Sequence, residues 1–600
     1  MRNRKTAKDA IEPQYGHLRY FPGTLITAFW LCCQLTFAEM PSQSATKQFS
    51  KLDASKLGVD FVSRLILDHP YSYLYHSGMT CSGIAAGDLD GDQKPDLFIA
   101  NGPGKNGLFL QTDGDGIQFE EYTNVAGVGL DGADQWASGV AFADVDNDGD
   151  LDIYVCNFQS PNQLFINQGS QNGHRVKFVE LAEAAGVDII DASHMSAFCD
   201  YDNDGDLDFF LLTNRIEDPN GSLSKLPVEF NRPGIPTLLP GFEDSYHIWV
   251  VDRDNWGVEA IGRNNYLFRN DGVDENGQVK FTDVTTISGI AGRGDGLSSL
   301  WWDADLDGDC DLYVCNDFIS PDQFYVNNGD GTFSNRIAES MPHTCWFSMG
   351  SSFGDIDNDG DFDMLVADMS ATSHYKSKVT MGAMGGMNLR RANESTPPQY
   401  MRNSLFLNAG ELTFREGAYL AGLASSDWTW SVKMNDFDSD GMLDVFLTNG
   451  VPREMNHSDI VITPEMLRGK HMWEFFKEGE MRKEMNRAYQ NQGHLQFKDV
   501  SKNWGLDHLG ASYGAVSTDL DLDGDLDLVV VNLEENISIF RNENQNKNQL
   551  TVKLIGSSAN RFGIGATIEL LAGEKTWIRQ LMPSVGYHSY DEPIVHFGLG

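Results

Sequence analysis

The sequence of 600 residues is poor in basic side chains, in cysteine and in long apolar runs. Its 44 lysine and arginine residues stand against 87 acidic ones, and the formal charge of -43 would repel a phosphate backbone, which argues against a nucleic-acid partner. The 8 cysteines are scattered and form no dense disulfide framework, so we expect the cysteines to be buried and to pack as small apolar residues. A hydrophobic share of 41% excludes wholesale disorder, and 60 glycines with 20 prolines favour a turn-rich β protein.

The N-terminal residues 1–38 have the features of an export segment. Basic residues up to Arg19 precede Leu25–Ala38, which is uncharged and mostly apolar but too short to span a membrane readily. Thr36–Ala38 offers a cleavage site with small residues. We expect residues 1–38 to be a signal peptide, or an N-terminal anchor if uncleaved, and the protein to be secreted or held in the cell envelope, in the periplasm or at the outer surface.

What the sequence has in abundance is one acidic pattern, Asp-x-Asp-x-Asp-Gly-x-x-Asp followed by an apolar run, which recurs seven times. The four aspartates of each copy stand at positions 1, 3, 5 and 9. They are Asp88, Asp90, Asp92 and Asp96; Asp144, Asp146, Asp148 and Asp152; Asp200, Asp202, Asp204 and Asp208; Asp303, Asp305, Asp307 and Asp311; Asp355, Asp357, Asp359 and Asp363; Asp436, Asp438, Asp440 and Asp444; and Asp519, Asp521, Asp523 and Asp527. The first copy has Gln93 in place of glycine at position 6, for which we expect a strained turn or a weaker site.

Four carboxylates on nine residues would repel one another strongly unless they bind a cation. Calcium takes six to eight oxygen ligands on flexible loops, whereas magnesium keeps several waters and rarely uses such a cage. An EF-hand would need an acidic residue at position 12 of an exiting helix, but that position is apolar in all seven copies: Ile99, Val155, Leu211, Val314, Val366, Leu447 and Val530. The sequence therefore predicts up to seven structural Ca²⁺ ions, each in a loop that links two strands.

The context of the loops repeats as well. A short strand precedes each loop, an apolar strand follows it, and a signature with asparagine at both ends comes next, as in Asn162–Asn167, Asn265–Asn270, Asn403–Asn408 and Asn486–Asn491. The fourth predicted strand opens with phenylalanine and ends at a glycine, over Phe119–Gly127, Phe178–Gly186, Phe281–Gly289, Phe414–Gly422 and Phe497–Gly505. A four-stranded unit repeated every 52 to 56 residues, with three interruptions, is typical of a propeller blade.

The two ends of this repeat region complement each other. The chain begins with only a Phe49–Gly58 strand and its last unit stops after Ser538–Asn542, so pairing these fragments would close a ring and remove two sheet edges. We predict an all-β fold, a seven-bladed β-propeller with calcium-loop repeats and with loop and helical insertions.

The loops and their flanking strands resemble the FG-GAP or VCBS repeats of integrin-like propellers. The stretches Asn548–Gly556, Asn560–Ala566 and Val595–Gly600 resemble the ASPIC/UnbV domain, which accompanies such propellers in the cartilage acidic protein-like family. The resemblance implies a propeller at residues 47–543 and a small C-terminal β domain at 548–600. That domain normally continues beyond a Phe-Gly-Leu-Gly stretch, so it is expected to be incomplete here.

Three insertions interrupt the repeats, at 215–262, 371–399 and 452–485. The first is rich in proline and aromatic residues, which favours a functional loop over a disordered one. The second contains the stretch MGAMGGM, for which we expect a flexible surface segment rather than a ligand groove. The third is predicted to form a helical cap over one face of the propeller, with Thr463 as N-cap, Pro464 in the first turn and Leu467, Met472, Phe475 and Phe476 on an apolar face.

No catalytic constellation is visible, and we predict that the protein is not an enzyme. The sequence has no His-Glu-x-x-His motif and no phosphate loop. Gly-x-Ser-x-Gly matches at Gly350–Gly354 and Gly510–Gly514 lead into acidic loops instead of the helix of a nucleophile elbow, so strand glycines explain them. His194, His247, His343, His374 and His457 are scattered, and each is expected to be an ordinary surface or core histidine.

The sequence favours an exported calcium-binding propeller that acts as a binding or adhesion module for an extracellular or cell-surface protein or glycan. We expect no nucleic-acid partner, and we expect contact with a membrane only through the N-terminal segment if it is uncleaved. One alternative is an enzyme similar to polysaccharide lyases, which would need a basic pocket for uronates, with Arg390 and Arg391 as isolated candidates. Another is an extracellular assembly scaffold.

Overall fold

The computed structural model describes residues 47–600, apart from 78–81, 115, 133–134, 172, 217–227, 233–234, 244–245, 253–254, 319, 381–394, 464–465, 467–468 and 545–547. The predicted export segment, Cys81, the MGAMGGM stretch and Arg390 with Arg391 lie outside the described residues. Within the described part of the chain, no helix is long and apolar enough to cross a membrane.

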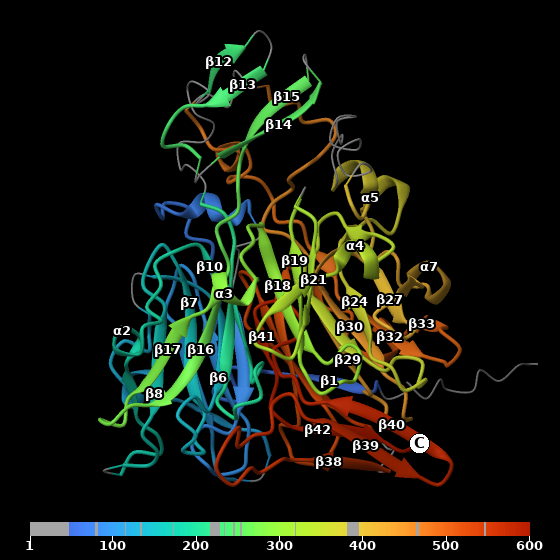
Figure 1. Ribbon diagram of the computed structural model, residues 1–600. Coiled ribbons are helices and arrows are strands. Elements are labelled where there is room, and N and C mark those ends of the chain that lie inside the picture. Colours follow the sequence, from blue (N-terminus) through green and yellow to red (C-terminus); the bar gives the residue numbers. More distant parts are fainter. Residues whose placement is uncertain are drawn as a thin grey trace, which may run out of the picture. The chain divides into compact units, whose positions relative to one another are not determined.

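Seven sheets form the repeats, each built on four antiparallel strands, and β41 (Ser589–Tyr590) and β25 (Met369–Ser370) add a fifth strand to the first and the sixth. Figure 1 shows how the blades are arranged. From the innermost strand outward they are β2 (Gly83–Gly87), β3 (Asp96–Ala100), β4 (Gly107–Gln111) and β5 (Phe119–Glu121); β6 (Trp136–Ala143), β7 (Asp152–Phe158), β8 (Gln163–Asn167) and β9 (Phe178–Glu180); β10 (Ser193–Cys199), β11 (Asp208–Thr213), β16 (Tyr266–Val273) and β17 (Val279–Asp283); β18 (Gly296–Trp302), β19 (Asp311–Asn316), β20 (Gln323–Asn327) and β21 (Phe333–Asn335); β23 (Ser351–Gly354), β24 (Asp363–Val366), β27 (Ser404–Asn408) and β28 (Phe414–Glu416); β29 (Asp427–Asn435), β30 (Asp444–Asn449), β32 (Arg487–Asn491) and β33 (Phe497–Asp499); and β35 (Ser512–Thr518), β36 (Asp527–Asn532), β37 (Ser538–Asn542) and β1 (Phe49–Leu52).

The innermost strands contact one another in a closed cycle. Strand β2 touches β6, which touches β10, and the contacts continue through β18, β23, β29 and β35 back to β2. The ring is completed within the last sheet, where Phe49 of β1 pairs with Asn542 of β37 in antiparallel register. The prediction of a seven-bladed propeller, closed by the two ends of the repeat region, is confirmed.

The outermost strand of the blades is shorter than predicted. In blade two only Phe178–Glu180 forms β9, and one turn of helix, α2 (Ala182–Ala185), replaces the rest. Gly186 ends this helix in the left-handed conformation, with φ of 82°, and Gly289, Gly422 and Gly505 do the same, whereas Gly127 is extended. The same turn recurs as α1 (Thr123–Ala126), α3 (Thr285–Ser288), α4 (Ile337–Ser340), α7 (Ala418–Ala421) and α8 (Ser501–Trp504).

A side-chain amide on the third strand of each blade, an asparagine in six blades and Gln111 in the first, links neighbouring blades. Asn167 donates from Nδ2 to the carbonyl of Leu89 in the preceding acidic loop at 2.9 Å, and Asn270 reaches Val145 in the same way at 2.8 Å. Asn327, Asn408, Asn491 and Asn542 repeat this bond, and in the first blade Gln111 donates to Leu520 across the closure at 2.8 Å. The asparagine signature of the sequence is therefore the hydrogen-bonded joint between blades.

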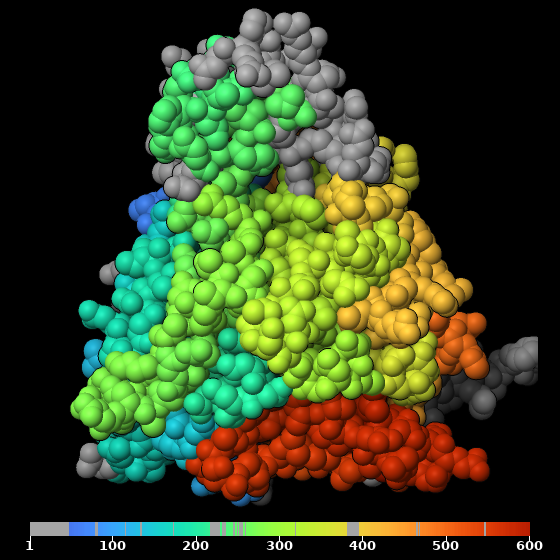
Figure 2. Space-filling model, viewed as in Figure 1, coloured from blue at the N-terminus to red at the C-terminus, as the bar shows by residue number. Residues whose placement is uncertain are grey.

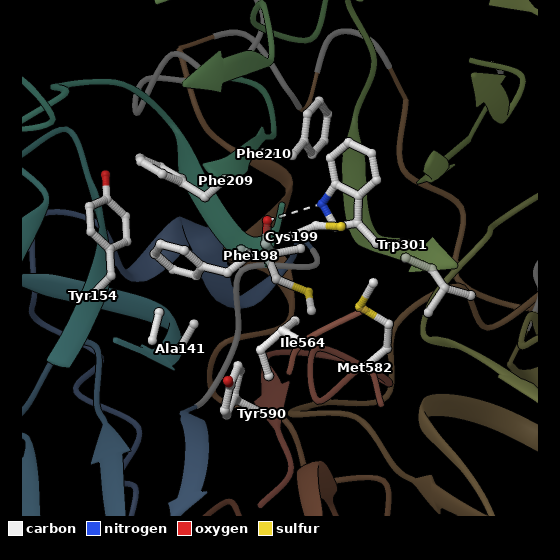
Figure 3. Packing of buried hydrophobic residues seen from close by; sticks show 14 of the residues in the cluster. Ala141, Tyr154, Phe198, Cys199, Phe209, Phe210, Trp301, Ile564, Met582 and Tyr590 are labelled. Carbon is white, nitrogen blue, oxygen red and sulfur yellow. Dashed lines mark hydrogen bonds between the residues drawn. The ribbon is translucent and has the colours of Figure 1, made fainter. Parts of the chain in front are cut away.

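The C-terminal residues 548–600 form β38 (Gln549–Val552) with β42 (Val595–Gly598), and β39 (Thr567–Ala572) with β40 (Lys575–Gln580). Figure 2 shows the C-terminal residues, in red, along one end of the molecule. Hydrogen bonds from Gln549 to Asp523 and from Trp577 to Gly441 place these strands against the acidic loops. The short strand β41 (Ser589–Tyr590) leaves them and pairs in parallel with β2 among the innermost strands. Figure 3 shows Tyr590, Met582 and Ile564 from this region packed in one cluster with Phe198 and Trp301 of the blades. The residues around β41 thus fill the centre of the ring.

The three insertions contain short elements within their described residues. The first contains two hairpins, β12 (Val228–Arg232) with β13 (Ile235–Leu238) and β14 (Tyr246–Asp252) with β15 (Asn255–Ala260). The second begins with β25 (Met369–Ser370) and α5 (His374–Val379), and it ends with β26 (Gln399–Tyr400), which pairs with β22 (Thr344–Cys345). In the described part of 452–485 the elements are a 3-10 turn, η2 (Met472–Phe475), and β31 (Glu484–Met485), which pairs with β34 (Leu509–Gly510).

The predicted amphipathic helix of the third insertion is therefore wrong for its described residues; Pro464 and Leu467 lie outside them. The apolar spacing reflects tertiary contacts instead. Trp473, fully buried, packs against Tyr75 of η1 (Ser72–Tyr75), with ring centroids 5.6 Å apart. The side chain of His471 accepts a hydrogen bond from the amide of Trp473 and fixes the start of the turn.

Candidate metal centres and an aromatic pocket

Each acidic loop connects the innermost strand of a blade to the second strand, and its backbone is folded onto its own carboxylates. In the second loop the amides of Asp148 and Gly149 donate to the two oxygens of Asp144, both at 3.0 Å. At position 9, Asp152 accepts from the amide of Val145 at 2.9 Å and from that of Asn167 at 2.8 Å. Position 9 is thus a buried joint between the loop and the third strand.

The loops gather carboxylate oxygens into small clusters. The described residues contain seven groups in which ligand atoms of at least three side chains lie within 4.8 Å of one another, and five of them are Asp88, Asp90 and Asp96; Asp144, Asp146 and Asp152; Asp200, Asp202 and Asp208; Asp303, Asp305 and Asp307; and Asp355, Asp357 and Asp359. Burial, followed by repulsion from Asp148, raises the pKa of Asp144 to about 7 and that of Asp146 to about 6. Such clusters are unfavourable as bare anions, and a bound cation would relieve the repulsion.

Several of the oxygens are buried without a hydrogen-bond partner. They include Oδ1 of Asp200, of Asp202 and of Asp438. A buried polar atom without a donor is costly unless something satisfies it. Because the atoms available as metal ligands are carboxylate oxygens on a flexible loop, the clusters fit a hard divalent cation such as Ca²⁺. The Asp sets predicted from the sequence are the residues that would hold it.

The C-terminal domain covers the face that carries these loops, which the sequence did not reveal. Trp577 donates from Nε1 to the carbonyl of Gly441 at 2.8 Å, and Gln549 donates from Nε2 to that of Asp523 at 3.1 Å. The Arg561 guanidinium donates to the carbonyl of Asp148. The loops therefore lie at an interface between the two parts of the chain.

The segment around β41 makes polar contacts inside the ring. Lys433 of β29 is fully buried and its Nζ lies 2.8 Å from both Oδ1 of Asp591 and the carbonyl of Val585. His194 of β10 and His588, both fully buried, bring their Nε2 atoms to 2.9 Å. Burial lowers the pKa of His194 to about 3, so the imidazole is neutral at physiological pH. These groups fasten the C-terminal segment to the blades.

A cavity of about 690 Å³ lies at the other end of the innermost strands. Its lining comes from the starts of innermost strands, as with Trp428 and Trp430, and from the residues that follow second strands, as with Arg215 and Asp317. Aromatic side chains that line it include Trp428, Trp430, Phe318, Phe347, Phe476 and Tyr75. We call this cavity the aromatic pocket. Beneath it, Trp430 packs against Tyr587 of the C-terminal segment, with ring centroids 5.1 Å apart.

Polar groups are few at the aromatic pocket. Arg215 places Nη1 3.1 Å from Asp295 and 3.7 Å from Asp317, so its charge is neutralised. The other polar residues of the lining are His76, Ser77, Asn456, His457 and Ser458. The combination of aromatic faces with paired charges suits a neutral ligand that has both apolar and hydroxyl-bearing surfaces.

The remaining sequence motifs have structural places. Ser352 and Ser512 of the Gly-x-Ser-x-Gly matches lie in β23 and β35 and are buried, as expected for strand residues. The described cysteines, Cys156, Cys199, Cys310, Cys315 and Cys345, are buried and unpaired. His343 is buried beside the hydroxyl of Ser404, with Nε2 3.0 Å from Oγ, and burial lowers its pKa to about 4.

Comparisons with known proteins agree with this architecture. Residues 88–155, 144–211 and 303–366 match the FG-GAP-like repeat family, and residues 556–600 match the ASPIC and UnbV family. The resemblance noted in the sequence is thereby confirmed.

Among curated proteins, the chain is 23% identical over 509 residues to cartilage acidic protein 1 of Homo sapiens, covering 77% of this chain and 67% of that protein. The identity to the Mus musculus protein is also 23%, covering 77% of this chain and 68% of that protein. The Xenopus tropicalis protein is 34% identical over 130 residues, covering 22% of this chain and 19% of that protein.

Among solved structures, a lectin from Agrocybe aegerita that recognises non-reducing terminal N-acetylglucosamine aligns with 78% of this chain and 92% of its own, at 13% identity and a TM-score of 0.33.

Proposed function

We propose that this chain, a propeller of FG-GAP-like repeats with an ASPIC and UnbV domain, is an exported calcium-binding protein that binds a glycan at the aromatic pocket. We assign the propeller to residues 47–543 and the C-terminal domain to 548–600. The observation that carries the proposal is the pocket itself, about 690 Å³ lined by aromatic rings, at the end of the blades opposite the acidic loops. A cavity of this volume holds a small saccharide or the end of a longer one.

Calcium has a structural role in this proposal. Its ligands are the predicted aspartates of the loops, and it neutralises carboxylates that are buried together and otherwise raise one another's pKa. Extracellular sites of this kind have dissociation constants on the order of 0.1–1 mM, because the medium supplies the ion. The loops and the pocket lie at opposite ends of the innermost strands, so the ion supports the fold without touching the ligand.

The charge at the pocket favours a neutral glycan over a uronate. Arg215 forms ion pairs with Asp295 and Asp317, so its guanidinium is not available as a free cation for the carboxylate of a uronate. The phenol of Tyr75 donates to the carbonyl of Arg64 at 3.2 Å and accepts from the amide of Ile66 at 3.0 Å, so it is engaged in the fold. These contacts favour binding over the lyase chemistry that was the alternative.

The proposal is tested on a glycan array that is probed with the full chain in millimolar calcium. We expect retention of neutral glycans by the wild type, and at least a tenfold loss for Phe318→Ala, which removes a partly exposed ring stacked 5.4 Å from Phe347. Tyr419→Ala, a change of an exposed tyrosine on the outer helix α7, is the matched control and should bind as the wild type does.

If the chain bound a purified surface protein and retained no glycan on the array, the ligand would be a protein and the glycan proposal would be wrong. Cleavage of a uronate polymer by the chain would favour the lyase alternative. Equal glycan binding by the wild type and Phe318→Ala would contradict the assignment to this pocket.

A further inference from the structure

The first acidic loop is built differently from the other six. Gln93 occupies position 6 with φ of 69°, whereas the glycines at this position have φ between 92° and 99°. Position 4 is Gly91, with φ of 79°. Asp88 accepts from the amides of Gly91 and Gln93, at positions 4 and 6, at 2.8 and 3.0 Å. In the second loop the donors are at positions 5 and 6, so the amide of position 6 is used in both loops and the other donor differs.

A protein cation lies on the carboxylates of this loop. The guanidinium of Arg175, which precedes β9 in the second blade, forms ion pairs with Asp90 through Nε and with Asp92 through Nη2, the latter at 3.0 Å. The same group donates to the carbonyl of Gln111 at 2.6 Å. Arg175 is also fixed through its backbone, since its amide donates to the phenol of Tyr122 at 3.1 Å. Positions 3 and 5 of the loop are therefore engaged by one planar cation.

A second cation approaches position 1 of the same loop. Nζ of Lys553, in the C-terminal domain, lies 3.6 Å from Oδ2 of Asp88. Together the guanidinium and the ammonium supply two positive charges, the charge of one divalent ion. Asp96 at position 9 keeps its two backbone hydrogen bonds, from the amides of Leu89 and Gln111, at 2.9 and 2.8 Å.

Five other loops show no such arrangement. Among the described residues, the aspartates at positions 1, 3 and 5 of the loops that begin at Asp144, Asp200, Asp303, Asp355 and Asp436 form no ion pair with a lysine or arginine. In the seventh loop Arg541 stays 4.0 Å from Asp521 and pairs with Glu543.

We infer that Arg175 and Lys553 take the place of the metal ion in the loop that begins at Asp88, so that this loop binds no calcium and the protein holds six ions instead of seven. The inference rests on the proposed function, in which the other loops bind calcium. Ion pairs join Arg175 of blade two to the carboxylates of blade one, whereas in the second loop the Arg561 guanidinium binds a backbone carbonyl and leaves the carboxylates to a cation from the medium. The first loop would therefore keep its conformation when calcium is withdrawn.

Native mass spectrometry of the full chain in calcium tests the inference, with the same substitution made in two loops. We expect six ions in the wild type and six in Asp90→Asn, but five in Asp146→Asn, because Asp146 is the position-3 residue of a loop in which the nearby Arg561 guanidinium meets a backbone carbonyl and not the carboxylates. Asp357→Asn in the fifth loop provides a second comparison and should also hold five.

Thermal unfolding supplies a readout that does not count ions. Asp90→Asn should lower the melting temperature equally in calcium and in chelator, since it weakens the pair with Arg175 in both. Asp146→Asn should lower it in calcium alone. Seven ions in the wild type, or the loss of one ion in Asp90→Asn, would overturn the inference, whereas a wild type without any bound calcium would contradict the proposed function.

Discussion

Replacement of Asp591 by asparagine should be among the most destabilising conservative changes in the chain. Its partner Lys433 is fully buried on β29, with Nζ 2.8 Å from Oδ1 of Asp591, and the Asp591 side chain is 13% exposed. Burial lowers the pKa of Lys433 although Asp591 opposes this, and burial raises the pKa of Asp591 although Lys433 opposes it. Each charge therefore depends on the other, and the same pair holds the C-terminal segment inside the ring.

The magnitude follows from the cost of leaving one buried charge alone. Removing a single partner of a buried ion pair costs about 3–5 kcal/mol, and the lower end applies here because Asp591 retains some access to solvent. Lys433→Met should cost a similar amount. The double variant should lie within roughly 2 kcal/mol of the wild type, since replacing both partners of a buried pair is often nearly neutral.

The assay is urea unfolding at a fixed, saturating calcium concentration, followed by tryptophan fluorescence and analysed as a double-mutant cycle. The reasoning would be refuted if either single change cost less than about 1 kcal/mol, or if the cost of the double variant equalled the sum of the two single costs.

Three further predictions concern the ions, the histidines and the joints between blades. Chelation should lower the melting temperature in differential scanning calorimetry, because each ion at 10 to 100 times its dissociation constant contributes roughly 1.4–2.7 kcal/mol; an unchanged curve in EDTA would contradict calcium binding. His194, with its folded pKa lowered to about 3, stays neutral while the unfolded chain takes up a proton near pH 6.5, so stability falls as the pH drops from 6.5 towards 3. His194→Gln should reduce the loss of stability between pH 7 and pH 5 by about 2 kcal/mol in urea titrations, and an unaltered pH dependence would count against it. Asn270→Ala should cost about 2–4 kcal/mol, because the buried carbonyl of Val145 loses its donor, whereas the exposed Asn276→Ala should cost less than about 0.5 kcal/mol in the same urea titrations.

Much of the architecture could be predicted from the sequence because its causes are local and repeated. The acidic pattern specifies a tight loop between two strands wherever it occurs, and the apolar residue at position 12, as in Val155, excludes an EF-hand helix. The strand fragments at Phe49 and Ser538 predicted closure, and they pair as antiparallel neighbours. The candidate ligand sets also follow from spacing alone, since three carboxylates on one loop cannot lie far apart.

Other features depend on residues that meet only when the chain folds. The helix predicted at 452–485 was wrong because Trp473 packs on Tyr75, nearly four hundred residues away along the chain, and this contact decides the local conformation. The aromatic pocket draws its walls from several blades, so no single segment of the sequence contains it.

The sequence by itself determined the repeat, the number of blades and the residues able to hold metal, because each of these is encoded within one short segment. The tertiary structure alone decided which basic side chains meet the first loop. Arg175 lies 83 residues beyond Asp92, and Lys553 comes from a different domain from Asp88, yet the ring brings both onto the first loop. Charge pairing acts over a few ångströms of space and not along the chain, so only the folded protein shows where a side chain can stand in for an ion.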